Sequence, residues 1–164
     1  MPDLLWNEVK NFFDPQIMGA LPDLWVPDTT AEDWQTVLDL IQSSGWRWDY
    51  REDDTVLPLP RAADVLPRPA DAEQSAELYV RPARDVLMIF RLMTATEIDF
   101  DVDLRELQGQ VGVDTLIDFM CAIGRQLGKP VLMAGEGQYG HPVLGFDPAS
   151  NRVVLLADPR DPED

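Results

Sequence analysis

Cysteine, histidine and long apolar runs are scarce in this chain of 164 residues. Cys121 is the one cysteine, so an internal disulfide and a cysteine-based zinc site are excluded, and its surroundings favour a small buried side chain. No run approaches the roughly 18 apolar residues of a membrane-spanning helix, and Met1–Trp6 is not a basic segment that leads into an apolar run. We expect a cytoplasmic protein that has no membrane partner.

Nucleophiles and bases are equally few. His141 is the one histidine, and the four serines lie outside any Gly-x-Ser-x-Gly motif. The glycines of Ala134–Gly140 precede neither a helix nor a Lys-Ser/Thr pair, so this segment is predicted to be a hairpin loop and not a phosphate-binding loop. We expect no catalytic residues and no cofactor, and hence a protein that is not an enzyme.

Basic residues are also few. Thirteen Lys and Arg residues stand against thirty Asp and Glu residues, which gives a formal net charge of −17 at pH 7. Such a surface repels the phosphates of nucleic acids and anionic bilayers, so we expect no nucleic-acid partner. It attracts a basic protein and accelerates the encounter. A second interpretation is that the charge serves solubility alone.

The length and the 45% apolar content are those of a single folded domain, 1–164. Apolar residues at helical spacing predict helices over residues 4–13, 29–45 and 114–127. The second of these begins at a capping box in Thr29–Glu32, and Gly128-Lys129-Pro130 closes the third.

Alternating apolar and polar residues predict strands over 46–51, 78–80, 86–92, 97–104, 131–134, 142–146 and 152–157. The three between 78 and 104 are expected to form an antiparallel meander, and the last two a hairpin. Residues 52–77 are predicted to be a proline-rich connection. The fold class is α+β, with an antiparallel sheet of about five to seven strands packed against two or three helices.

Five tryptophans lie within the first 48 residues. Trp34 shares a helical stripe with Val37 and Ile41 and is predicted to belong to the core. Trp25 sits between Pro22 and Pro27 on a segment that has the pattern of an edge strand or an extended arm. We expect Trp25 to be exposed and to insert into a partner, because tryptophan is enriched at binding hot spots.

Three carboxylates alternate along one predicted strand, at Asp99, Asp101 and Asp103. Alternation places them on one face, which we expect to be exposed and to steer a basic partner. One alternative makes them the metal site of a hydrolase, although the glycine and the terminal glutamate of a calcium loop are missing. Another is that they only discourage edge-to-edge pairing of strands.

The element order, the acidic balance and segments such as Trp34–Leu40, Gly128–Met133 and Pro142–Pro148 resemble actinobacterial immunity proteins of polymorphic toxin systems. The resemblance implies a cytoplasmic inhibitor that binds a cognate toxin domain, occludes its active cleft and has no activity of its own. Two other classes stay open: the metal-dependent hydrolase, and a regulatory subunit of a larger assembly.

Overall fold

A single antiparallel sheet dominates the protein. The computed structural model describes residues 4–66 and 75–160. In this part of the chain the strand order is β3-β2-β4-β5-β6-β1-β7-β8-β9. The strands are β1 (Asp23–Pro27), β2 (Arg47–Glu52), β3 (Thr55–Leu57), β4 (Ala76–Ala83), β5 (Val86–Arg91), β6 (Glu97–Val102), β7 (Val131–Ala134), β8 (Leu144–Asp147) and β9 (Arg152–Leu155). The α+β class and the meander, β4-β5-β6, are confirmed.

The sheet is larger than the five to seven strands predicted, because β1 and β3 lie in proline-containing segments whose pattern does not identify them as paired strands. β1 is not an edge strand but pairs with β6 on one side and β7 on the other. Pro27 is its last residue, where a missing N–H costs little of the ladder. β3 lies inside the predicted proline-rich connection, as does the short helix α4 (Ala62–Val65); residues 67–74 of that connection are outside the described residues.

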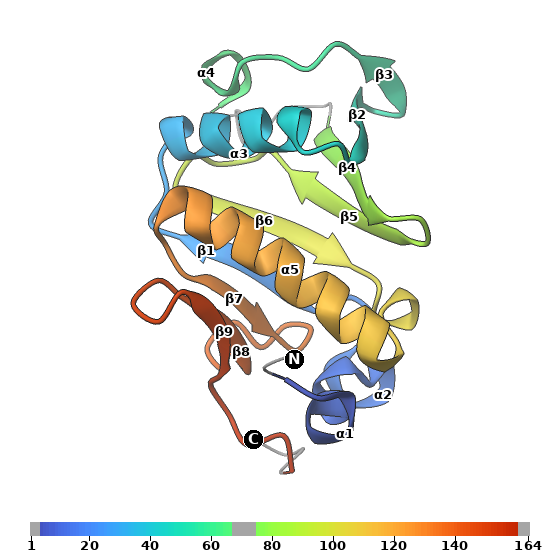
Figure 1. The fold of residues 1–164 in the computed structure, drawn as a ribbon. Helices are drawn as coiled ribbons and strands as arrows, with labels where there is room; N and C mark the ends of the chain where they lie inside the picture. Colours follow the sequence, from blue (N-terminus) through green and yellow to red (C-terminus); the bar gives the residue numbers. More distant parts are fainter. Residues whose placement is uncertain (1–3, 67–74, 161–164) are drawn as a thin grey trace.

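Two long helices, α3 (Ala31–Ser43) and α5 (Gly109–Leu127), lie across the same face of the sheet (Figure 1). Their apolar stripes pack on every second residue of the strands, for example Ile98, Phe100 and Val102 of β6. Phe119 of α5 contacts Phe100 edge to face, with ring centroids 5.5 Å apart. The hydrophobic core therefore lies between this face and the helices.

Capping residues set the bounds of both helices. Thr30 is the N-cap of α3 and exchanges hydrogen bonds with Asp33, so the capping box lies one residue later than predicted. α5 begins at Gly109, five residues before the predicted start, and ends at Leu127, with Gly128 as its C-cap, whose φ of 65° suits glycine. Neither α5 nor another helix in the described part of the chain is long and apolar enough to cross a membrane.

The N-terminal segment is a chain of short helices at one end of the sheet (Figure 1). It contains α1 (Trp6–Val9), a 3₁₀ turn η1 (Lys10–Phe13) and α2 (Pro15–Met18), and a second 3₁₀ turn, η2 (Leu104–Glu106), precedes α5. The predicted helix over residues 4–13 is thus split in two. Its apolar stripe still packs inward, because Val9, Phe12 and Phe13 are buried.

Candidate binding surface

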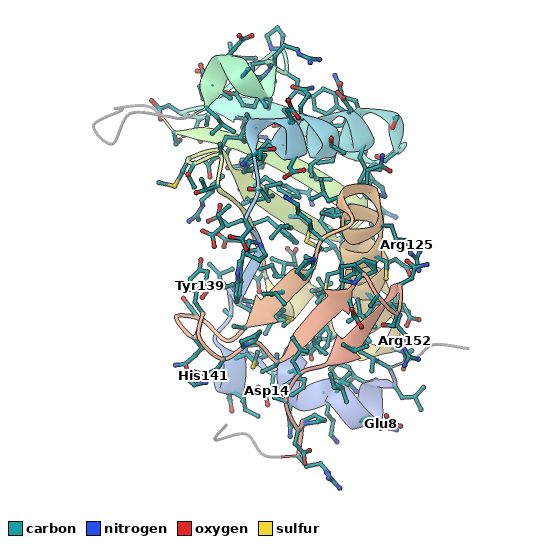
Figure 2. The ribbon with its side chains drawn as sticks, turned by 90° about the vertical axis from the view of Figure 1, so that its left-hand side faces the viewer. Glu8, Asp14, Arg125, Tyr139, His141 and Arg152 are labelled. Atoms are coloured by element: carbon teal, nitrogen blue, oxygen red, sulfur yellow. The ribbon has the colours of Figure 1, made fainter. Side chains whose placement is uncertain are left out.

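The second face of the sheet is not covered by the long helices. Because side chains alternate, the strand that sends Ile98, Phe100 and Val102 into the core sends Glu97, Asp99 and Asp101 to the opposite side. We call this side the open face. In Figure 2, Tyr139 and Arg125 of α5 lie on opposite sides of the molecule.

Strand register gathers carboxylates at the middle of the open face. Asp23 of β1 lies beside Asp101 of β6, and Glu136 follows β7 on the other side of β1. We call Asp23, Glu97, Asp99, Asp101 and Glu136 the acidic cluster. Burial raises the pKa of Asp99 to about 6, the charges of Glu97 and Asp101 add to the rise, and Arg91 opposes it. The pKa of Asp23 is also raised, chiefly by burial, although the Gly137 N–H donates to its carboxylate over 2.8 Å.

The three aspartates predicted to act together have different environments. Asp101 forms an ion pair with Arg91 at 2.7 Å, and burial raises its pKa against the influence of that arginine. Asp103 lies after the last residue of β6, caps η2 and pairs with Arg105 at 2.7 Å, and the Arg105 guanidinium lowers its pKa. All three are half-buried, so this face is only partly as exposed to solvent as expected.

This pairing also bears on the metal-site alternative. A divalent cation needs several oxygen ligands that converge on one point. Within residues 4–66 and 75–160, no group of three or more His, Cys, Asp and Glu side chains is placed to hold a metal ion. The geometry that the hydrolase alternative requires of Asp99, Asp101 and Asp103 is therefore not found.

Trp25 is buried, and the prediction that it is exposed is wrong. Its side chain projects to the open face, where register puts it beside Asp99, but the residue is only 6% exposed. The ring of Tyr139 packs on it at a centroid distance of 4.7 Å. The sequence pattern gave the wrong prediction for Trp25 because β1 is a central strand and a loop folds over it. Trp34, by contrast, is fully buried in the core as predicted, and its indole N–H donates to the Thr94 carbonyl over 2.9 Å.

Tyr139 is the site residue that sequence reasoning missed. It lies in the loop of residues 135–143 between β7 and β8, and it is 45% exposed. Burial and the charges of Asp23 and Asp99 raise its pKa to about 12, so its hydroxyl stays neutral at physiological pH. The signal that could have identified it is an aromatic residue within a glycine-rich hairpin loop, where side chains have little to pack on.

The loop that carries Tyr139 is held in place by the end of α2. The Glu136 N–H donates to the Met18 carbonyl over 2.7 Å. Gly19, with φ of 80°, lies so close that a Cβ atom there would be 2.6 Å from the Cβ of Glu136. Glycine is therefore needed at position 19, both for its backbone conformation and for this approach.

The remaining reactive residues lie apart from the acidic cluster. Cys121 is buried on α5, as predicted. His141 is exposed at the end of the same loop as Tyr139, and its backbone N–H donates to the Gln138 carbonyl (Figure 2). Comparison with known proteins leads to no relative: no protein-family model, no curated protein and no solved structure matches this chain.

Proposed function

We propose that the protein is a non-enzymatic binding protein whose open face receives a basic protein domain, and that its biological role is that of an immunity protein. In this role it binds a cognate toxin domain in the cytoplasm and occludes the toxin's active cleft. The observation that carries the proposal is the acidic cluster beside an exposed aromatic side chain, Tyr139, in a chain of net charge −17.

The state of Asp99 supports a cationic partner. The pKa of Asp99 is raised to about 6, so ionising this carboxyl costs more free energy than ionising an exposed one. The cause is its half-buried position among other carboxylates. A lysine or arginine from a partner reverses that penalty, because an opposite charge nearby favours the ionised form. The free protein thus carries an unfavourable charge arrangement that a basic ligand relieves.

Tyr139 supplies the contact that electrostatics alone does not. Charge steers association and raises its rate, whereas large, partly apolar side chains dominate the affinity of most interfaces. Tyr139 rests on the buried ring of Trp25, which limits its motion before a partner arrives. A residue that is already ordered loses less side-chain entropy on binding. Tyr139 therefore replaces Trp25 as the proposed aromatic anchor.

The toxin assignment rests on the sequence resemblance and on charge. Toxin domains that attack nucleic acids carry basic clefts, and an acidic surface can occupy such a cleft in place of the substrate. The gene next to the one that encodes this chain supplies the first candidate partner, and the proposal expects it to encode a secreted protein with a C-terminal toxin domain.

Association kinetics with that toxin domain test the proposal. The double variant Glu97→Gln/Asp99→Asn removes two charges of the acidic cluster and leaves the Arg91–Asp101 ion pair intact. We expect association at low salt to slow by about fivefold or more, and its salt dependence to flatten, because steering acts on the association rate. Stopped-flow measurements between about 50 and 500 mM salt, roughly the range over which screening develops, give both quantities.

The matched control is Glu8→Gln/Asp118→Asn, which removes two exposed carboxylates from helices away from the open face. We expect it to change the association rate by less than about twofold. Equal slowing by both double variants would mean that only net charge matters, and the open face would then not be the docking surface. Failure of wild-type protein to bind or inhibit the toxin domain would reject the immunity role itself.

A further inference from the structure

The end of the open face away from the acidic cluster is basic. Arg47 of β2 and Arg81 of β4 are directly paired across the two strands, and both side chains are exposed. Arg84 lies just beyond, in the turn between β4 and β5. Like charges at directly opposite positions of a sheet destabilise the pair. The three arginines are called the arginine corner below.

Most other cations of this acidic chain have a partner, and the arginine corner does not. Side chains of Arg51, Arg91, Arg105, Arg160 and Lys129 each form an ion pair with an aspartate. Within residues 4–66 and 75–160, the guanidinium groups of Arg47, Arg81 and Arg84 have neither an ion pair nor a hydrogen bond. Three unpartnered cations therefore share one corner of a protein that carries thirty carboxylates.

The carboxylate nearest to Arg47 along β2 is already engaged. Asp49 lies between Arg47 and Arg51 on β2, and the Arg51 Nε donates to it. Arg51 is fixed in turn by the ring of Tyr79, whose centroid lies 4.3 Å from its guanidinium carbon. Asp49 is thus paired with Arg51 and does not neutralise the charges of Arg47 and Arg81.

Two clefts meet at the arginine pair. One, of about 110 Å³, is lined by Arg47 and Arg81 together with Arg51 and Tyr79. The other, of about 220 Å³, is lined by Arg47, Arg81 and Arg84. Arg47 and Arg81 line both clefts, and each cleft has a third arginine, Arg51 or Arg84. A ligand in either cleft would therefore contact three arginine side chains. These volumes suit a small molecule and not an extended chain.

We propose that the arginine corner binds a compact dianionic oxyanion, either a phosphate monoester or a dicarboxylate. Guanidinium groups bind such anions through parallel N–H donors. Two guanidinium groups on neighbouring strands can donate to different oxygens of one anion. An extended polyanion would also meet the acidic cluster of the same face and be repelled, whereas a compact one meets only the local positive charge. The site lies on the same face as the proposed toxin interface but uses neither the acidic cluster nor Tyr139.

Titration of the full-length protein with inorganic phosphate, and separately with succinate, tests the proposal. Both titrations are run at constant ionic strength, with sodium chloride as the balancing salt, and are followed by calorimetry and by the thermal unfolding midpoint. We expect saturable binding and a rise of the midpoint with at least one anion, since a ligand that binds only the folded state stabilises it. The anion bound about tenfold more tightly identifies the natural class.

The variants Arg47→Gln and Arg81→Gln are each expected to weaken that binding by about tenfold or more. Each should unfold at or above the wild-type temperature in the absence of anion, because it removes a like-charge pair. Arg152→Gln, an exposed arginine on the opposite edge strand β9, is the matched control and should bind like wild type (Figure 2). The proposal is overturned by the lack of saturable binding at constant ionic strength, or by equal weakening in the control.

Discussion

The two faces of the sheet use the same strands for different purposes. β6 presents Ile98, Phe100 and Val102 to the helices and carboxylates to the open face, and the first set is buried while the second is half-buried. On the helix face, apolar contact with α3 and α5 stabilises the fold. In the acidic cluster of the open face, carboxylates are held together at a cost in stability. Residues that stabilise the protein and residues that we propose for partner binding thus alternate along the same strand.

The largest effect is expected on the helix face. Trp34→Ala removes a fully buried indole that packs on Phe90 at a ring centroid distance of 6.4 Å. It also leaves the Thr94 carbonyl without its donor. We expect a loss of about 3 to 5 kcal/mol in the free energy of unfolding, because the surrounding core cannot collapse into the space. Urea denaturation measures it, and a loss below about 1 kcal/mol would show that Trp34 is not part of the close-packed core.

Trp25→Ala tests whether the open face contributes to stability at all. Trp25 is nearly as buried as Trp34, but its cover is a loop and not a helix. We expect a smaller loss, about 2 kcal/mol, because the Tyr139 loop can settle into part of the cavity. The same urea series decides the order of the two variants. If Trp25→Ala costs as much as Trp34→Ala, the open face is a second core and the contrast between the faces fails.

Asp99→Asn is expected to stabilise the protein above pH 6. The pKa of Asp99 is raised from 3.8 to about 6, so between these values the folded state binds more protons than the unfolded state. The contribution of Asp99 to stability is therefore greatest below about pH 4 and is lost as pH rises through 6. Asparagine cannot ionise, so the variant should gain about 1 to 2 kcal/mol over wild type at pH 7 and almost nothing at pH 4.

The measurement is urea denaturation of both proteins from pH 4 to pH 8, with Asp118→Asn as the control for loss of one exposed carboxylate. A gain that does not depend on pH would indicate a hydrogen-bonding effect of the amide and not relief of a raised pKa. The same pKa predicts that a basic partner binds wild type more tightly as pH rises from 5 to 7, and that Asp99→Asn loses this dependence.

Much of the fold could be predicted from the spacing of apolar residues, because in regular helices and strands this spacing reflects which side chains are buried. The meander, the long helices and the burial of Trp34 followed from it. The position of β1 could not be predicted, since a short apolar run between prolines looks the same at an edge and in the middle of a sheet. Only the pairing of Trp25 with both Asp99 and Leu132 shows where it lies.

The make-up of the candidate binding surface could be predicted in part. Alternation correctly placed Asp99 and Asp101 on the side of β6 away from the core. It could not show that Asp103 lies past the end of the strand and is paired with Arg105, because ion pairs depend on side-chain positions that no pattern records. The same holds for Tyr139 and for the arginine corner, which the fold assembles from separate segments.

The position of β1 has a consequence for how the chain folds as it is made. Synthesis delivers Asp23–Pro27 early, but its partner strands begin at Glu97 and Val131. The middle of the sheet cannot close until most of the polypeptide has left the ribosome, and contacts between such distant residues form slowly. Until then Leu24 and Val26, which end up buried, have no strand to shelter them. The nascent chain therefore exposes these apolar side chains until the sheet is completed.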